Sequence, residues 1–159
     1  MQVKTEASAT GFEEPRLGLA DRAPTLCRAM VALDGAVELD SSLRDLVCLR
    51  ASILNGCAYC VDMHTLDAAA RGETEQRLHA VAAWHEAPFF TERERAALLL
   101  TDAMTGLAES HVPAETYQLA KDHFPEDELV QLIWAIVVIN AWNRVAVTTR
   151  MLAGEYRPG

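Results

Sequence analysis

Residues 41–64 read SSLRDLVCLRASILNGCAYCVDMH, and this stretch holds the strongest structural signals in the 159-residue chain. Apolar residues recur at helical spacing in its first half. This pattern predicts a helix that is capped by residues 40–42 and buries one apolar face. The residues of that face are Leu43, Leu46, Val47, Ile53 and Leu54.

The pair Asn55-Gly56 is a turn signal that ends this helix. A second helix is predicted from about Cys57 to Arg71, with Gly72 as a left-handed C-terminal cap. The two helices therefore form a hairpin whose turn delivers Cys57 at the start of the second helix.

The rest of the chain shows the same helical periodicity, and we find no alternating pattern typical of a strand. We expect an all-α fold, a compact single-domain bundle of about six to seven helices over residues 15–159. Residues 1–14 are polar and are expected to form a flexible N-terminal extension. Further helices are predicted at about 24–38, 74–84, 91–107, 113–123 and 128–152.

Composition excludes several functional classes. The formal net charge of −9, without a basic cluster, disfavours nucleic acid as a partner. The longest apolar run, residues 132–139, is far shorter than the roughly 20 residues that span a bilayer, so no membrane association is expected. Four cysteines are too few for a disulfide scaffold in a chain of this length, and a C-x-x-C in a cytoplasmic protein indicates redox or metal chemistry.

The motif Cys57-x-x-Cys60-x-x-x-His64 places two thiols and an imidazole on one helix face, within roughly 60° of each other. A cysteine in the first helical turn meets free N–H groups and the positive end of the helix dipole, which favour the thiolate. Peroxide reduction requires a thiolate, a proton for the departing oxygen and a second thiol to trap the sulfenic acid. The motif supplies all three groups, with the His64 imidazole as proton shuttle.

Residues 43–64 resemble the alkylhydroperoxidase D and carboxymuconolactone decarboxylase family, in its peroxidase-like branch. The resemblance continues through residues 83–95 and 139–144. It implies an oligomeric helical domain, a homotrimer or homohexamer, that reduces peroxides with electrons from an external thiol or dithiol. It implies no cofactor and no metal. The decarboxylase branch lacks the paired cysteines, so its reaction is not expected here.

The resemblance also implies separate roles for the site residues. Cys60 would attack the peroxide and Cys57 would resolve the sulfenic acid. A proton relay would join His64 to an acidic residue twelve positions before the first cysteine, which here is Asp45. The family usually has glutamate there, and alkylhydroperoxidase D has histidine where this chain has Tyr59. Both departures predict reduced activity.

Other interpretations stay open at this point. The pair could toggle as a redox sensor without turnover, or Cys57, Cys60 and His64 could bind zinc with a fourth ligand from His79, His85 or Asp45. The chain could also be a family member that has lost catalysis. Asp45 could merely stabilise the start of its helix in the first turn.

Three further expectations concern packing. Cys27 and Cys48 are expected to be small buried residues. Arg50 lies on an apolar face, so it requires either an interface or a carboxylate partner. The polar residues of the last helix, Asn140, Asn143 and Arg144, would need partners across an interface or at a pocket, and with the apolar surface of that helix they favour a subunit interface.

Overall fold

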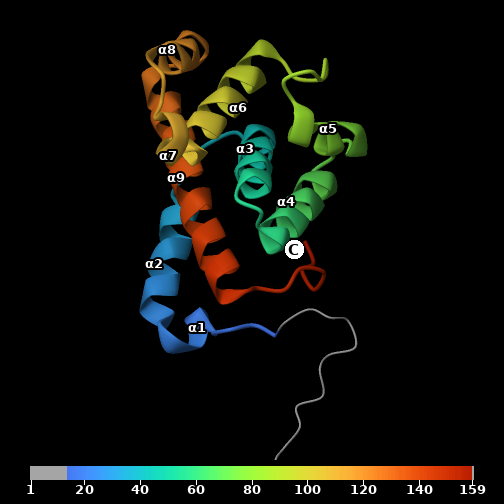
Figure 1. The fold of residues 1–159 in the computed structure, drawn as a ribbon, viewed down its shortest axis with the longest axis vertical. Helices are drawn as coiled ribbons and strands as arrows, with labels where there is room; N and C mark the ends of the chain where they lie inside the picture. Colours follow the sequence, from blue (N-terminus) through green and yellow to red (C-terminus); the bar gives the residue numbers. More distant parts are fainter. Residues whose placement is uncertain (1–13, 159) are drawn as a thin grey trace, which may run out of the picture.

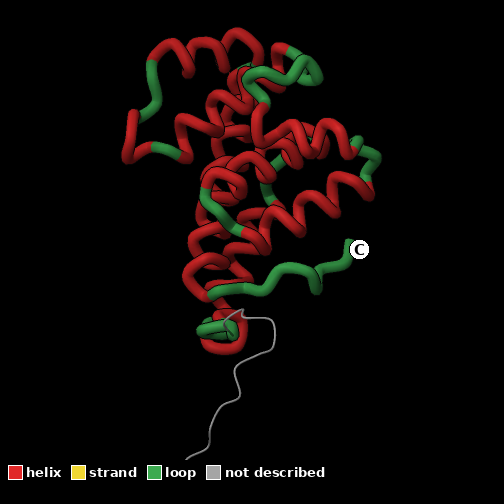
Figure 2. Tube along the Cα trace, turned by 45° about the vertical axis from the view of Figure 1, so that its right-hand side comes forward, coloured by secondary structure: helices red, strands yellow, loops and turns green. Residues whose placement is uncertain are grey.

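The structure is a computed structural model that describes residues 14–158. Within this range every regular element is a helix, as Figure 2 shows. The all-α prediction is confirmed. The elements are α1 (Leu19–Arg22), α2 (Pro24–Gly35), α3 (Ser41–Leu54), α4 (Ala58–Ala70), α5 (Glu75–Ala80), the short 3-10 helix η1 (Val81–Ala83), α6 (Glu92–Thr105), α7 (Leu107–Ser110), α8 (Ala114–His123) and α9 (Glu126–Thr149).

Helix α3 is the central element, since it packs against α4, α6 and α9 (Figure 1). Its residues from position 45 to 52 are all buried, because other helices cover it on several sides. One apolar cluster joins α3 to α6, α8 and α9, and a second joins it to α4, η1 and α6. The α3–α4 turn is thereby held in the interior, next to α9.

Local signals placed most helix ends correctly. The Thr91 hydroxyl and the Glu94 carboxylate form a complete capping box at the start of α6. Gly56 (φ +64°) and Gly72 (φ +98°) adopt the left-handed conformation that the turn and the cap required. Helix α3 is capped by the Asp40 carboxylate, which accepts the Leu43 N–H at 3.0 Å.

Two helix ends were predicted wrongly. The helix expected to continue to residue 107 ends at Thr105, and α7 is a separate turn after Gly106. The last helix was expected to reach residue 152 but ends at Thr149. The expected extension over residues 1–14 lies outside the described residues except for Glu14, which is exposed.

Candidate functional site

The two cysteines of the motif meet at the first turn of α4. Cys57 is the N-cap residue, and its sulfur accepts the backbone N–H of Cys60 at 3.3 Å. The Cα atoms of Cys57 and Cys60 are 5.4 Å apart and their sulfurs are joined as a disulfide. Both residues are buried, each with 2% of its surface exposed. The spacing therefore brings the two sulfurs together as the sequence predicted.

A polar network fixes the α3–α4 turn against α9. The Asn55 side-chain amide donates to the Asn140 and Asn143 side-chain oxygens at 3.0 and 2.9 Å, and the Asn143 amide donates to the Ser52 hydroxyl at 3.0 Å. Asn143 is completely buried. The Arg144 guanidinium donates to Asn140 on the same helix. Asn143 is buried with its partners within one chain, so the prediction that the polar residues serve an interface was wrong for Asn143.

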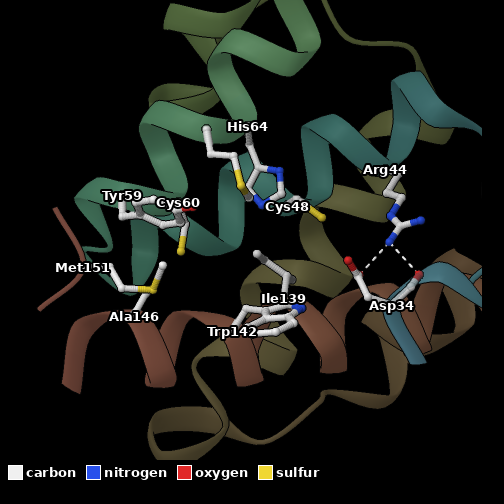
Figure 3. A pocket seen from close by; sticks show the side chains of 11 residues that line it. Asp34, Arg44, Cys48, Tyr59, Cys60, His64, Ile139, Trp142, Ala146 and Met151 are labelled. Carbon is white, nitrogen blue, oxygen red and sulfur yellow. Dashed lines mark hydrogen bonds and ion pairs between the residues drawn. The ribbon is translucent and has the colours of Figure 1, made fainter. Parts of the chain in front are cut away.

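A cavity of about 350 Å³ opens beside Cys60 (Figure 3). Its wall includes Cys60 but not Cys57, so the second cysteine of the motif is the one that a bound molecule meets. The His64 ring lies on the same wall. The remaining wall is largely apolar and aromatic, with one ion pair: Tyr59, Met63, Ile139, Trp142, Ala146, Met151, Cys48, Asp34 and Arg44.

His64 is held as a neutral base. Burial lowers its pKa below the ordinary 6.5, against the opposing pull of the Asp45 and Asp67 carboxylates. Its Nε2 atom is buried without a hydrogen-bond partner among the described residues. A buried imidazole nitrogen without a partner retains a free lone pair or N–H group, on a residue whose ring lines a cavity.

Asp45 lies near His64, at a second and more polar cavity. Both residues line this cavity of about 360 Å³, which also contains Arg71. The Arg71 guanidinium holds the Asp45 carboxylate with two hydrogen bonds, of 2.8 and 2.5 Å. Asp45 is in the second turn of α3, which has no acid in its first turn, so the helix-stabilising interpretation was wrong.

Cys48 is a cavity residue that the sequence did not single out. It is buried as expected, but it also lines the cavity beside Cys60. Burial raises the pKa of Cys48 to about 12, although the Arg44 guanidinium favours its thiolate. The spacing of four between Arg44 and Cys48 was the available signal, because it puts both on one face of α3.

Zinc ligation is not supported by the geometry of the described residues. They contain no group of three or more histidine, cysteine or acidic side chains that could hold a metal ion. His79 is exposed, and the His85 Nε2 atom lies 3.2 Å from Asp102. The Asp102 carboxylate also accepts a hydrogen bond from the Arg50 guanidinium at 2.6 Å. The buried Arg50 therefore has the carboxylate partner that the sequence analysis required.

Comparison with known proteins places the chain in a family. The model of the carboxymuconolactone decarboxylase family matches residues 21–103, which is more than half of the chain. The chain belongs to the carboxymuconolactone decarboxylase family. The uncharacterized protein YdfG of Bacillus subtilis is 41% identical over 110 residues, which cover 69% of this chain and 75% of that protein. The uncharacterized protein YnjA of Escherichia coli is 33% identical over 94 residues, and the match spans about half its length, 51%.

Solved structures agree with this family assignment. A protein of unknown function from Agrobacterium tumefaciens, described as a candidate antioxidant defence protein AhpD, is 38% identical. It superposes with a TM-score of 0.87 over 90% of this chain and 100% of that one. The apo form of a debrominase has the same fold at 19% identity, with a TM-score of 0.76 over 85% of this chain and 74% of the other.

Only part of the cavity wall lies within the residues that match the family model. Cys57, Cys60, His64 and Asp45 lie within the matched residues 21–103 of the carboxymuconolactone decarboxylase family. Trp142, Ala146 and Met151, which form the opposite wall in Figure 3, lie outside them. In this member, the cysteines and the histidine of the motif lie in the matched residues, whereas much of the cavity wall comes from α9 and from the residues after it.

Proposed function

We propose that this member of the family is a thiol-dependent peroxidase that reduces a hydroperoxide through the Cys57–Cys60 dithiol. The observation that carries the proposal is the asymmetry of the pair: Cys60 lines the cavity together with His64, whereas Cys57 caps α4 behind it. A molecule in the cavity meets one sulfur, and the second sulfur is already in bonding position.

In the first step His64 takes the proton of the Cys60 thiol, and the thiolate attacks the outer peroxide oxygen. The O–O bond breaks. Cys60 becomes a sulfenic acid, and the alkoxide that leaves takes a proton from the His64 imidazolium to give an alcohol. The lowered pKa of His64 suits the second proton transfer, because it makes the imidazolium a stronger acid that returns its proton readily.

In the second step the Cys57 sulfur attacks the Cys60 sulfenic sulfur, and water leaves as the disulfide forms. Cys57 is suited to this step because its sulfur receives the Cys60 N–H at the positive end of α4, which stabilises a thiolate. An external dithiol then restores both thiols by two exchange reactions and is oxidised to its own disulfide. We place the protein in the cytoplasm, where such reductants are maintained.

Asp45 is proposed as the second member of the proton relay. It faces His64 across the polar cavity, and negative charge there favours the imidazolium that the first step forms. Its carboxylate is shared with Arg71, so the relay is expected to be weaker than one with an unpaired acid.

The test follows thiols and peroxide together in Cys60→Ser, Cys57→Ser and the parent. Addition of tert-butyl hydroperoxide to the reduced parent should consume about two thiols per chain. Cys60→Ser should lose the reaction. Cys57→Ser should consume about one equivalent of peroxide and stop at a sulfenic acid that dimedone traps. Cys27→Ser serves as the matched control and should behave as the parent, and full activity in Cys60→Ser would refute the proposal.

A redox sensor is the second candidate, and the burial of both sulfurs favours it, because a buried disulfide exchanges slowly with external thiols. Continuous assay with a dithiol separates the two functions. Steady peroxide consumption over many cycles supports the peroxidase. A single oxidation without turnover supports the sensor, and no oxidation by any peroxide indicates a member that has lost catalysis.

A further inference from the structure

The chain turns back sharply after α9. Arg150 adopts a left-handed backbone conformation (φ +59°), and the Met151 N–H donates to the Ala146 carbonyl at 3.0 Å. This pairing is a helix-ending turn that normally uses glycine. It directs the chain away from the axis of α9, and Figure 1 shows the final segment crossing from α9 to the beginning of α4. We call residues 150–158 the C-terminal strap.

Two hydrogen bonds attach the strap to α4. The Gly154 N–H donates to the Asp62 carboxylate at 2.8 Å, and the Tyr156 hydroxyl donates to the Asp67 carboxylate at 2.8 Å. Both acceptors are on the helix that carries Cys60 and His64. The strap therefore bridges the two helices that form opposite walls of the Cys60 cavity.

Met151 is the strap residue that reaches this cavity. Its side chain also lines a neighbouring cavity of about 640 Å³, which lies between the strap and the beginning of the described chain. The two cavities share three wall residues, Tyr59, Trp142 and Met151. Tyr59 and Trp142 are fixed on α4 and α9, whereas Met151 lies after the end of α9.

We propose that Met151, held in place by the strap, is a specificity-determining residue that limits the size of the molecules reaching Cys60. With the strap attached, the space beside Cys60 is the cavity of about 350 Å³, which suits compact hydroperoxides. When Met151 moves or is shortened, this space joins the neighbouring cavity and longer molecules fit. The consequence for catalysis rests on the proposed function, but access to the Cys60 sulfur does not.

The first experiment measures access without relying on catalysis. The full chain is reduced and treated with iodoacetamide or with the bulky pyrene maleimide, and modification of Cys60 is followed by peptide mass spectrometry. Two variants should widen access to Cys60. Met151→Ala shortens the side chain that separates the two cavities, and Tyr156→Phe removes one of the two hydrogen bonds that hold the strap to α4. Tyr117→Phe is the matched control, since Tyr117 is an exposed tyrosine on α8.

We expect the ratio of pyrene maleimide to iodoacetamide rates to rise about tenfold in Met151→Ala, and severalfold in Tyr156→Phe, where one attachment remains. The ratio in Tyr117→Phe should equal that of the parent. Unchanged ratios in both strap variants, with parent-like circular dichroism, would overturn the proposal even if the protein is a peroxidase.

The second experiment measures kcat/KM for tert-butyl hydroperoxide and for linoleate hydroperoxide. Met151→Ala should shift the preference toward the long substrate about tenfold, mainly through KM. An equal change for both substrates would indicate a structural effect and would contradict the size limit. If neither peroxide is reduced by the parent, the peroxidase assignment fails and the modification rates still decide the role of Met151.

Discussion

Two cysteines with opposite properties share the cavity wall. Cys48 has a pKa of about 12, so it remains a thiol at neutral pH and is a poor nucleophile. Cys60 is bonded to Cys57 and lines the same cavity as His64, the two groups proposed as resolving sulfur and base. The position of each sulfur, rather than its residue type, decides which one is suited to react.

The protonation of His64 makes stability depend on pH. Its pKa is lowered in the folded state, so below pH 6.5 the unfolded chain takes up a proton that the folded chain does not. The unfolding free energy should therefore fall as the pH drops below 6.5, by up to about 1.4 kcal/mol per pH unit from this group. Urea denaturation at several pH values measures this slope.

His64→Gln supplies the comparison for that experiment. It removes the titrating group while keeping a polar side chain, so its slope between pH 6.5 and 5 should be smaller than that of the parent. His79→Gln, at an exposed site, should leave the slope unchanged. Equal slopes in the parent and in His64→Gln would mean that His64 is not held neutral by burial.

At the level of helices, the contact between the α3–α4 turn and α9 rests on buried amides. Asn143→Ala removes the group that accepts from Asn55 and donates to Ser52. Because Ser52 is buried and Asn55 is partly buried, and each loses a hydrogen bond, we expect a loss of about 2 kcal/mol in unfolding free energy. Gln118→Ala, at an exposed bond to Asp122, is the control and should cost less than about 0.5 kcal/mol.

The same helices show what sequence could and could not provide. The capping box at Thr91 and the turn at Gly56 were predicted because their partners lie within a few residues. The partner of Asp45 is Arg71, which is 26 residues away, and the side-chain partners of Asn55 on α9 are more than 80 residues away. Such pairings depend on how helices pack, and helical periodicity carries no information about which helices meet.

The residues of the cavity wall show the same difference between local signals and contacts between distant parts of the chain. Cys60 and His64 were predicted from spacing within one helix, whereas Trp142 and Met151 reach the cavity only because α9 packs beside α4. Sequence alone therefore predicted that Cys60 and His64 share a site, but not the surface that surrounds them.

For the whole molecule, the outer face of α9 predicts self-association. By length and composition α9 could span a membrane, but it packs against α3 and α6, and many of its residues are buried. Val130, Trp134 and Val137 remain 42–50% exposed at a spacing that puts them on one face. We therefore expect the parent to self-associate, in the homotrimer or homohexamer that the family resemblance implies, and Val137→Glu to dissociate it, since the new charge would be buried.

Sedimentation velocity tests this expectation. Val147→Glu is the control, because Val147 is similarly exposed on a different face of α9 and should leave the assembly intact. A parent that sediments as a monomer would contradict the prediction, as would a Val137→Glu protein that keeps the assembly of the parent.

The N-cap residue of α4 is Cys57, whose sulfur changes its covalent bonding during the proposed catalytic cycle. The Cys57 sulfur accepts the N–H of Cys60 in the first turn of the helix, and in the proposed cycle the same sulfur alternates between a thiol and a bond to Cys60. The electron density at this acceptor differs between the two states, and with it the strength of the hydrogen bond that starts the helix. The proposed cycle therefore predicts a coupling between the oxidation state of the protein and the hydrogen bond that its backbone makes at Cys60, one turn before His64.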